Sequence, residues 1–455
     1  MPIAALALWA LVAAAWALAS RPLGRYLVRV LNGEATVLDP WLSGIEHLWM
    51  GRAAGKNQSW GGYVAGAAAA SLVGGWLWQL PGPVGGAQGL VADGVRGTGL
   101  LLVPAASVAV AATGLRALGG RRPGAIVEDL LRLLTRLLFP LAILAALALA
   151  AAGDPGRLAL MEACGLLAGR GIPAAIVGLP AAANLVGVVG MGLLPLAVFY
   201  SVGPLTGNRA LGRALTLLMG LGFAALVLVL AATAGDRAGM PTAWGPGGTL
   251  LRWAASSTLG VGRAGPPGGG GAQVAWLAGR LSEVIGGAVG AGLLPLMGLL
   301  VLVVVVVSLM KGHSPRFMGR PLGRHDILAG AVLYGMRPVL VLGALALLAG
   351  FGREPPAPLL SVLAHVARVL GSWAPGAAPW NGGLQLAGVV AAYVPWAAWI
   401  ALARGWAQGT PRLRADVGLG TTAAWLAALA SASLVMTALL FLPVLALAPV
   451  VGGGP

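Results

Sequence analysis

One apolar run, bounded by glycines on one side and basic residues on the other, constrains this chain most strongly. It lies in Leu281–Asp326 and holds about twenty mostly apolar residues. The residues before it are Glu283, Gly286, Gly287, Gly290 and Gly292, and those after it are Lys311, Arg316, Arg320 and Arg324. The run is long enough to cross a bilayer, and small residues at helical spacing let another helix approach closely. A basic exit marks the cytoplasmic end of such a helix.

Composition places the rest of the chain in the same class. Of its 455 residues, 58% are apolar and only 9% are charged, whereas a soluble protein carries about a quarter charged residues. The net charge is +16, but the basic residues lie in short loops, which favours topology signals over nucleic-acid binding. The lone Cys164 rules out an internal disulfide, and the four histidines lack metal-type spacing. We therefore expect a multi-span membrane protein.

Ten hydrophobic segments are expected to be membrane helices. They are residues 3–20, 62–80, 99–118, 131–152, 182–202, 213–234, 285–309, 327–350, 385–405 and 422–448. Lysine and arginine are more frequent in the loops after odd-numbered segments than after even-numbered ones, and Arg132, Arg136 and Arg337 are among those that fall within segments. This imbalance puts the odd loops in the cytoplasm and both chain termini outside.

The even-numbered loops are rich in glycine and proline, and three contain apolar stretches too short to span a membrane. These stretches are Leu158–Ala168, Gly248–Val261 and Leu359–Leu370. A short helix followed by a glycine-containing return is typical of a pore loop, because non-helical backbone is tolerated at membrane depth only inside protein or against water. Ordinary extracellular loops remain the alternative.

The predicted fold is an all-α polytopic membrane protein with up to four pseudo-repeated helix–pore loop–helix units around a central pore. The whole chain, 1–455, forms one transmembrane domain in this interpretation. Its repeats cover about 62–118, 131–202, 213–309 and 327–405, with extra helices at 3–20 and 422–448.

Several motifs in chain order resemble one family. They are RPLGRYLVRVLNGEATVLDPWLSGIEHLW (Arg21–Trp49), QSWGGY (Gln58–Tyr63), the segment Ala111–Leu141 with Asp129 and Arg132, EVIGGAVGAG (Glu283–Gly292), HSPRFMGRPLGRHDI (His313–Ile327) and FLPVLALAPV (Phe441–Val450). The chain is thereby similar to the potassium-binding, channel-like subunit (KdpA) of the Kdp-type potassium-transporting P-type ATPase. The resemblance implies ten spans with four pore loops, and a multi-pass location in a bacterial-type cytoplasmic (inner) membrane.

The resemblance also implies that backbone carbonyls of the pore loops bind potassium, since rings of oxygens replace the hydration shell of the ion. The first loop, Pro81–Thr98, is too short for the family's filter, and Gly94–Gly97 stands near its place. The second loop is reduced to Ala168–Gly171, the third retains most at Ser256–Gly262, and the fourth keeps Gly371 and Ser372. The ion-binding candidates are Gly169, Gly171, Ser257, Thr258, Gly260, Gly371 and Ser372.

Each candidate filter region contains an arginine, and these are Arg96, Arg170, Arg263 and Arg368. A guanidinium is permanently charged, and one at the mouth of a narrow pore repels a cation by several kcal/mol at low effective dielectric. Alternatively the side chains point into the outer vestibule, bind lipid headgroups or pair with acids. We expect a diverged family member whose potassium selectivity is weakened or lost.

No ATP-hydrolysing motif is present in the sequence. Gly51–Lys56 has the wrong spacing for a phosphate-binding loop, Asn57 stands where Ser or Thr is needed, and no Asp-Lys-Thr-Gly motif occurs. Energy for transport must therefore come from partners, which the resemblance names as a P-type ATPase catalytic subunit and small single-span subunits. Membrane lipid is the other expected partner of the basic loops.

The leading functional hypothesis is a non-catalytic subunit that binds and translocates potassium. It needs no covalent cofactor and no metal beyond potassium. The alternative is a non-conducting, channel-derived scaffold whose pore is blocked by arginines. Glu283 fits two roles equally, either near the ion path or at a helix start, where its charge complements the helix dipole.

Overall fold

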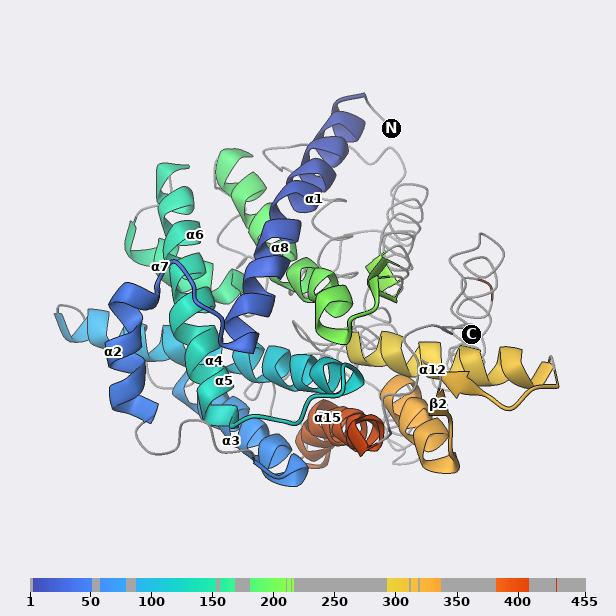
Figure 1. Ribbon diagram of the computed structural model, residues 1–455. Helices are drawn as coiled ribbons and strands as arrows, with labels where there is room; N and C mark the ends of the chain where they lie inside the picture. The colour runs from blue at the N-terminus through green and yellow to red at the C-terminus, as the bar shows by residue number, and fades with distance from the viewer. Residues whose placement is uncertain are drawn as a thin grey trace, which may run out of the picture.

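In the computed structural model, helices make up almost all of the residues that the structure describes (Figure 1). The structure describes residues 3–50, 58–78, 87–152, 156–167, 181–209, 211–213, 215–216, 293–310, 312–317, 320–336, 382–408 and 431. The helices are α1 (Ile3–Asn32), α2 (Asp39–Met50), α3 (Trp60–Trp78), α4 (Ala87–Leu118), α5 (Ile126–Leu133), η2 (Leu134–Leu138), α6 (Phe139–Ala151), α7 (Gly156–Leu167), α8 (Ala181–Thr206), α12 (Leu293–Met310) and α15 (Gly382–Gln408). Two short strands, β1 (Arg316–Phe317) and β2 (Arg320–Pro321), form an antiparallel hairpin.

Within these residues, four helices are long and apolar enough to cross a membrane. They are Asp93–Leu118, Ile126–Ala151, Leu185–Thr206 and Leu293–Met310. The helical, membrane-spanning character of the chain is thus supported. The full count of ten spans, the four repeats and the pore stay predictions, because most of the third and fourth predicted units lie outside the described residues.

The prediction of a loop before the third segment was wrong for residues 87–98. We expected a loop over Pro81–Thr98, but α4 begins at Ala87 and continues without a break to Leu118. Each glycine in a helix interior costs about 1 kcal/mol relative to alanine, and several glycines in 87–98 suggested a loop. Here Gly99 and Gly74 allow α4 to lie against α3, and that packing offsets the helix penalty.

The helix α4 occupies the centre of the described bundle. It packs against α3, α7, α8 and α15, and most of its apolar span is buried. The indole of Trp399 on α15 donates a hydrogen bond to the Val110 carbonyl at 3.2 Å. A Cβ at Gly114 would overlap that indole, so only glycine permits this crossing.

The second predicted half-helix, Leu158–Ala168, corresponds to α7, which buries Ala163, Cys164 and Leu167. It packs against α4, α6 and α8. The return that would complete a pore loop falls in 168–180, outside the described residues, and stays a prediction.

The first predicted span forms the N-terminal part of a longer helix, α1, which packs along α8 (Figure 1). Trp16 donates from its indole to the Val189 carbonyl at 3.0 Å, and its ring lies against Gly192. Close approach at a glycine again sets the distance between two helices.

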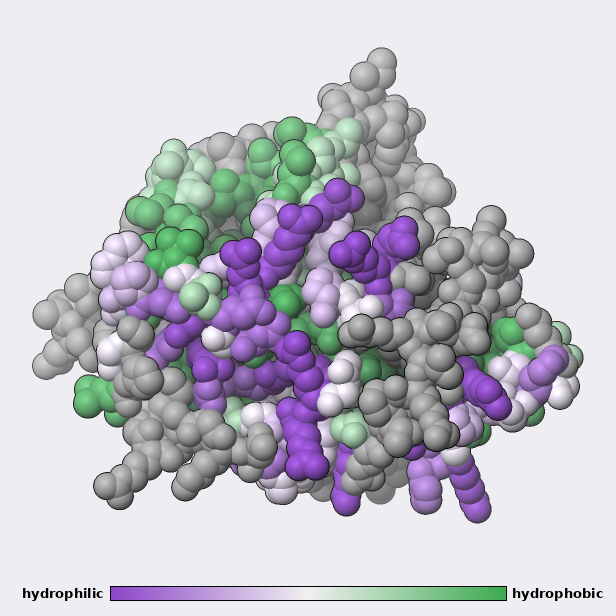
Figure 2. Space-filling model, in the orientation of Figure 1, coloured by the Kyte–Doolittle hydropathy of each residue, from purple (hydrophilic) through white to green (hydrophobic). Residues whose placement is uncertain are grey.

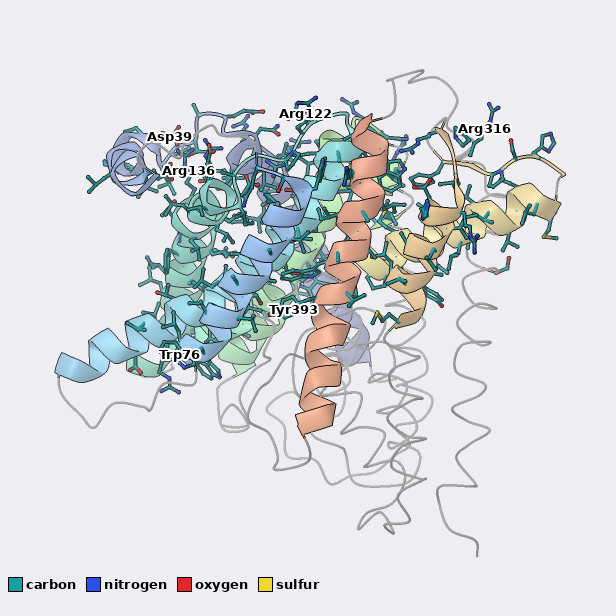
Figure 3. All side chains as sticks on the ribbon, turned by 90° about the horizontal axis from the view of Figure 1, so that it is seen from below. Asp39, Trp76, Arg122, Arg136, Arg316 and Tyr393 are labelled. Atoms are coloured by element: carbon teal, nitrogen blue, oxygen red, sulfur yellow. The ribbon has the colours of Figure 1, made fainter. Side chains whose placement is uncertain are left out.

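One end of the bundle gathers charged side chains, among them Asp39, Arg122, Arg136 and Arg316, and we call it the basic face. Figure 3 shows Asp39, Arg122, Arg136 and Arg316 along one edge of the molecule, with Trp76 well away from it. Figure 2 shows hydrophilic side chains gathered on this face and hydrophobic ones beside them. The β1–β2 hairpin lies here too, with Phe317 buried and stacked on Trp406 at 5.6 Å between ring centroids.

The α3–α4 crossing yields a stability prediction. A Cβ at Gly99 would lie 2.7 Å from the Gly74 carbonyl oxygen, whereas one at Gly94 would have no heavy atom within 4 Å. We expect Gly99→Ala to destabilise the protein by about 1–3 kcal/mol through overpacking. Gly94→Ala, in the same helix, should be neutral or slightly stabilising. Thermal unfolding of the detergent-solubilised variants measures both, and equal transition temperatures would contradict the tight crossing.

Candidate functional site: charged networks at the basic face

All of the predicted ion-binding residues lie outside the described part of the chain. This applies to Gly169, Gly171, Ser257, Thr258, Gly260, Gly371 and Ser372, and also to Glu283 and to the arginines Arg170, Arg263 and Arg368. Their roles stay predictions. Arg96 is the one predicted site residue that the structure describes.

Arg96 lies on α4 and contacts an aromatic ring of α3. Its guanidinium carbon is 4.9 Å from the centroid of the Trp78 ring. A cation over an indole face is stabilised by about 0.5–2 kcal/mol, depending on its exposure. The contact places this charge at the α3–α4 interface. An aromatic ring is not among the partners expected from the sequence.

The strongest polar arrangement described is an ion pair between Arg116 and Asp129 at the basic face. Arg116 lies in the last turn of α4 and Asp129 in the first turn of α5, and both side chains are more than nine-tenths buried. The guanidinium donates to both carboxylate oxygens, with Nη1 3.2 Å from Oδ1. Two-point geometry of this kind gives a strong, directional bond.

Further groups complete the network around this pair. Arg116 also donates to the Leu31 carbonyl oxygen at 3.0 Å and to the Thr113 hydroxyl at 2.8 Å. The Tyr63 hydroxyl lies 2.6 Å from Asp129 Oδ2. One charge pair therefore joins α1, α3, α4 and α5.

Local sequence explains why the pair forms where it does. A cation in the last turn of a helix and an anion in the first turn of the next are each favoured by the helix dipoles. The connection between them includes Gly120, whose φ of +79° is a conformation that favours glycine. This turn returns the chain so that α5 starts beside the end of α4.

A second network surrounds Arg136, which lies in the π-helical turn η2. Its Nε donates to Glu46 Oε1 at 2.8 Å, and Nη1 lies 2.9 Å from Asp39 Oδ1. The Thr135 hydroxyl donates to the same Glu46 oxygen at 2.8 Å. Because Asp39 and Glu46 both belong to α2, these contacts fasten α2 to the long helix α5–η2–α6.

The carboxylates of α2 are held in their charged form. The Thr36 hydroxyl, 2.6 Å from Asp39, lowers the pKa of that carboxyl below its usual value. Burial alone would raise the pKa of Glu46, but hydrogen bonds from Arg136 and Thr135 outweigh it, so the pKa is lowered. Both acids stay ionised at neutral pH.

These networks are suited to holding helices rather than to catalysis. Every carboxylate in them is paired with arginine, and in the described ranges no group of three metal-ligating side chains gathers. Sequence reasoning noted Asp129 and Arg136 but missed Arg116, Tyr63 and Glu46 as partners. The available signal was charge inside apolar segments, which is costly in a membrane unless paired.

Removing one member of the first network tests its importance. Asp129→Asn leaves the buried Arg116 without its counter-charge and should destabilise the protein by about 3–5 kcal/mol. Tyr63→Phe removes one hydrogen bond to a charged group and should cost about 1.5–3 kcal/mol. Thermal or denaturant unfolding in detergent measures these changes, and the exposed Arg122→Gln is the control. A loss for Asp129→Asn no greater than for the control would contradict a structural role.

The attachment of α2 should depend on pH. Because the pKa values of Asp39 and Glu46 are lowered in the folded protein, their stabilisation is complete above the usual carboxylate range. It is lost as the pH falls through the lowered values. Hydrogen-exchange protection of the α2 amides, corrected for intrinsic rates, should therefore be constant near neutral pH and fall below about pH 4. Glu46→Gln should lower that protection at neutral pH, and Glu34→Gln should not.

Comparisons with known proteins agree with the motifs. Residues 264–358 match the family model of KdpA, the potassium-transporting ATPase A subunit. A potassium-transporting ATPase potassium-binding subunit from Rhodococcus erythropolis is 33% identical over 178 residues, which are 35% of this chain and 31% of the relative. The chain thus spans about a third of the first relatives it matches.

Other relatives of the same name align over much more of the chain. The protein from Microcystis aeruginosa is 26% identical over 75% of this chain and 73% of its own length. The protein from Laribacter hongkongensis is 28% identical over 97% of this chain and 96% of its own length. That alignment extends over 559 residues, more than the 455 of this chain, so over a hundred aligned positions have no residue here. The resemblance carried by the motifs is confirmed: the chain is similar, at low identity but along most of its length, to potassium-transporting ATPase potassium-binding subunits, and residues 264–358 match the KdpA family model.

Proposed function

We propose that the chain is the potassium-binding and translocating subunit of an ATP-driven potassium import complex. The match between residues 264–358 and the potassium-transporting ATPase A subunit carries this proposal. That region includes Glu283, the glycines that follow it and the span α12. Relatives named as potassium-binding subunits, which align with most of the chain, support it further.

In this proposal, potassium is bound by backbone oxygens of the pore loops. Rings of carbonyls substitute for the water shell of the ion, and glycine permits the tight, partly left-handed backbone that points them inward. The proposed positions are those predicted from the sequence, with the third loop, Ser256–Gly262, as the best preserved. Potassium is cargo here rather than a resident cofactor.

Energy comes from a separate subunit in this proposal. A P-type ATPase subunit supplies phosphorylation, and small single-span subunits complete the assembly in a bacterial cytoplasmic membrane. Arg122 and Arg316 come from two different odd-numbered loops and lie along one edge of the molecule (Figure 3), which supports a common cytoplasmic side for these loops. Both termini then lie outside.

A second candidate is a scaffold subunit whose pore does not conduct. Three observations favour it. In the alignment with the Laribacter hongkongensis relative, over a hundred positions have no residue in this chain. In addition, residues 87–98 of the first predicted pore loop belong to a continuous helix. The predicted loops also contain Arg170, Arg263 and Arg368. A narrow filter lined in this way would exclude cations.

Potassium uptake separates the two candidates. In cells without their own uptake systems, the chain expressed with its ATPase partner should restore growth at low potassium and accumulation of a rubidium tracer. Gly260→Val should abolish uptake, because a branched side chain blocks the tight backbone of the third loop. Thr98→Ala is the control, since among the described residues that hydroxyl bonds only to the Gly94 carbonyl within α4.

The outcome is interpreted against equal amounts of each protein in the membrane. Uptake that appears only after Arg170, Arg263 and Arg368 are replaced by neutral residues would overturn the transport proposal and support the blocked scaffold. Uptake by the unaltered chain would exclude the scaffold.

A further inference from the structure

The helix α2 is amphipathic, with its charged side turned toward the protein and its apolar side turned away. Asp39 and Glu46 are seven residues apart, so they lie on one face, where Glu46 is only 2% exposed. Trp41 and Leu48 are also seven residues apart and lie on the opposite face. Their exposed fractions are 71% and 82%. This orientation is the reverse of that of a surface helix in water.

The surroundings of α2 place it at the edge of a bilayer. It is fastened to Arg136, and the same continuous helix exposes Leu144 and Leu147 farther along. Eight residues of helix separate Arg136 from Leu144, a distance of about 12 Å. This is close to half the thickness of a hydrocarbon core. With Leu144 near the middle of the hydrocarbon core, the headgroup layer therefore begins near Arg136 and α2.

A row of exposed arginines lies on α1 and just after α4, and its member Arg122 is on the basic face (Figure 3). Arg21, Arg25 and Arg29 recur every four residues on α1, and all three are exposed. Arg121 and Arg122, which follow α4, are exposed as well. Arg21 lies over the Tyr200 ring and Arg121 donates to the Asn32 side chain. Among the described salt bridges, none neutralises these five charges.

We propose that α2 and this arginine row form a binding surface for anionic lipid. The Trp41–Leu48 side of α2 enters the boundary between headgroups and acyl chains, and the arginines bind lipid phosphates. An interfacial helix with tryptophan on its apolar side has this arrangement, and basic residues favour the anionic cytoplasmic leaflet. The exposed apolar side of α2 together with the unneutralised positive charge of the arginine row selects anionic lipid over a protein partner as the occupant.

The depth of α2 is the first test. The chain has one cysteine, the buried Cys164, so a Cys164→Ser background allows single sites to be labelled. A spin label at Leu48→Cys, in nanodiscs of phosphatidylcholine and phosphatidylglycerol, should be accessible to oxygen and shielded from a water-soluble nickel complex. A label at Glu34→Cys, in the exposed turn before α2, should show the reverse. Nickel access at position 48, or exclusion of both reagents by covering protein, would overturn the proposal.

Lipid preference is the second test. The full-length chain is purified from mixed lipid and the retained phosphatidylglycerol is compared with retained phosphatidylcholine by mass spectrometry. Arg25→Gln with Arg29→Gln should lower this ratio at least about fivefold, because each basic residue near an anionic surface contributes about a factor of five. Arg25→Lys with Arg29→Lys keeps the charge and should retain the ratio. An unchanged ratio in the glutamine variant, with normal folding by thermal unfolding, would contradict the proposal.

Discussion

The ion pair between Arg116 and Asp129 is the interaction on which the described bundle most depends. Two charges that are removed from water cost several kcal/mol each unless their geometry compensates them. Here two-point contact, the Tyr63 hydroxyl and the carbonyl at Leu31 provide that compensation. Because these groups belong to four helices, the pair fixes how α1, α3, α4 and α5 meet at the basic face. Apolar packing alone is not directional and does not specify one arrangement.

Glycine determines the same arrangement in the apolar part of the molecule. Between α3 and α4 the close approach involves Gly74 and Gly99, and between α4 and α15 it involves Gly114. In lipid there is little hydrophobic gain from helix association, so close packing and hydrogen bonds supply it. Among the described residues, glycine therefore serves close contacts between helices as well as turns.

The sequence predicted the apolar helices well and the polar contacts poorly. Runs such as the one in α12 can be identified from hydropathy because a membrane span must satisfy its backbone internally. Residues 87–98 were predicted as a loop because their helix propensity is low. The α3 surface that stabilises them as a helix cannot be inferred from the local sequence. The helix α2 was not foreseen, and Glu46 pairs with Arg136 across 90 residues of chain. Such a distant pairing follows from the three-dimensional arrangement and not from any local pattern.

The π-helical turn η2 has a consequence for how this chain tolerates changes in length. A π turn accommodates one residue more than an α turn, and one residue corresponds to a rotation of about 100°. Loss of a single residue from 134–138 would restore regular α-helical hydrogen bonding. By itself this would make the helix locally more stable. The two ends of the helix would, however, turn out of phase. Either Asp129, near the start of this helix, would move away from Arg116, or Leu144 and Leu147 would rotate away from the side on which they are now exposed. The extra residue in η2 thus sets the rotation between the polar α5 end of the helix and its apolar α6 end, which face different neighbours.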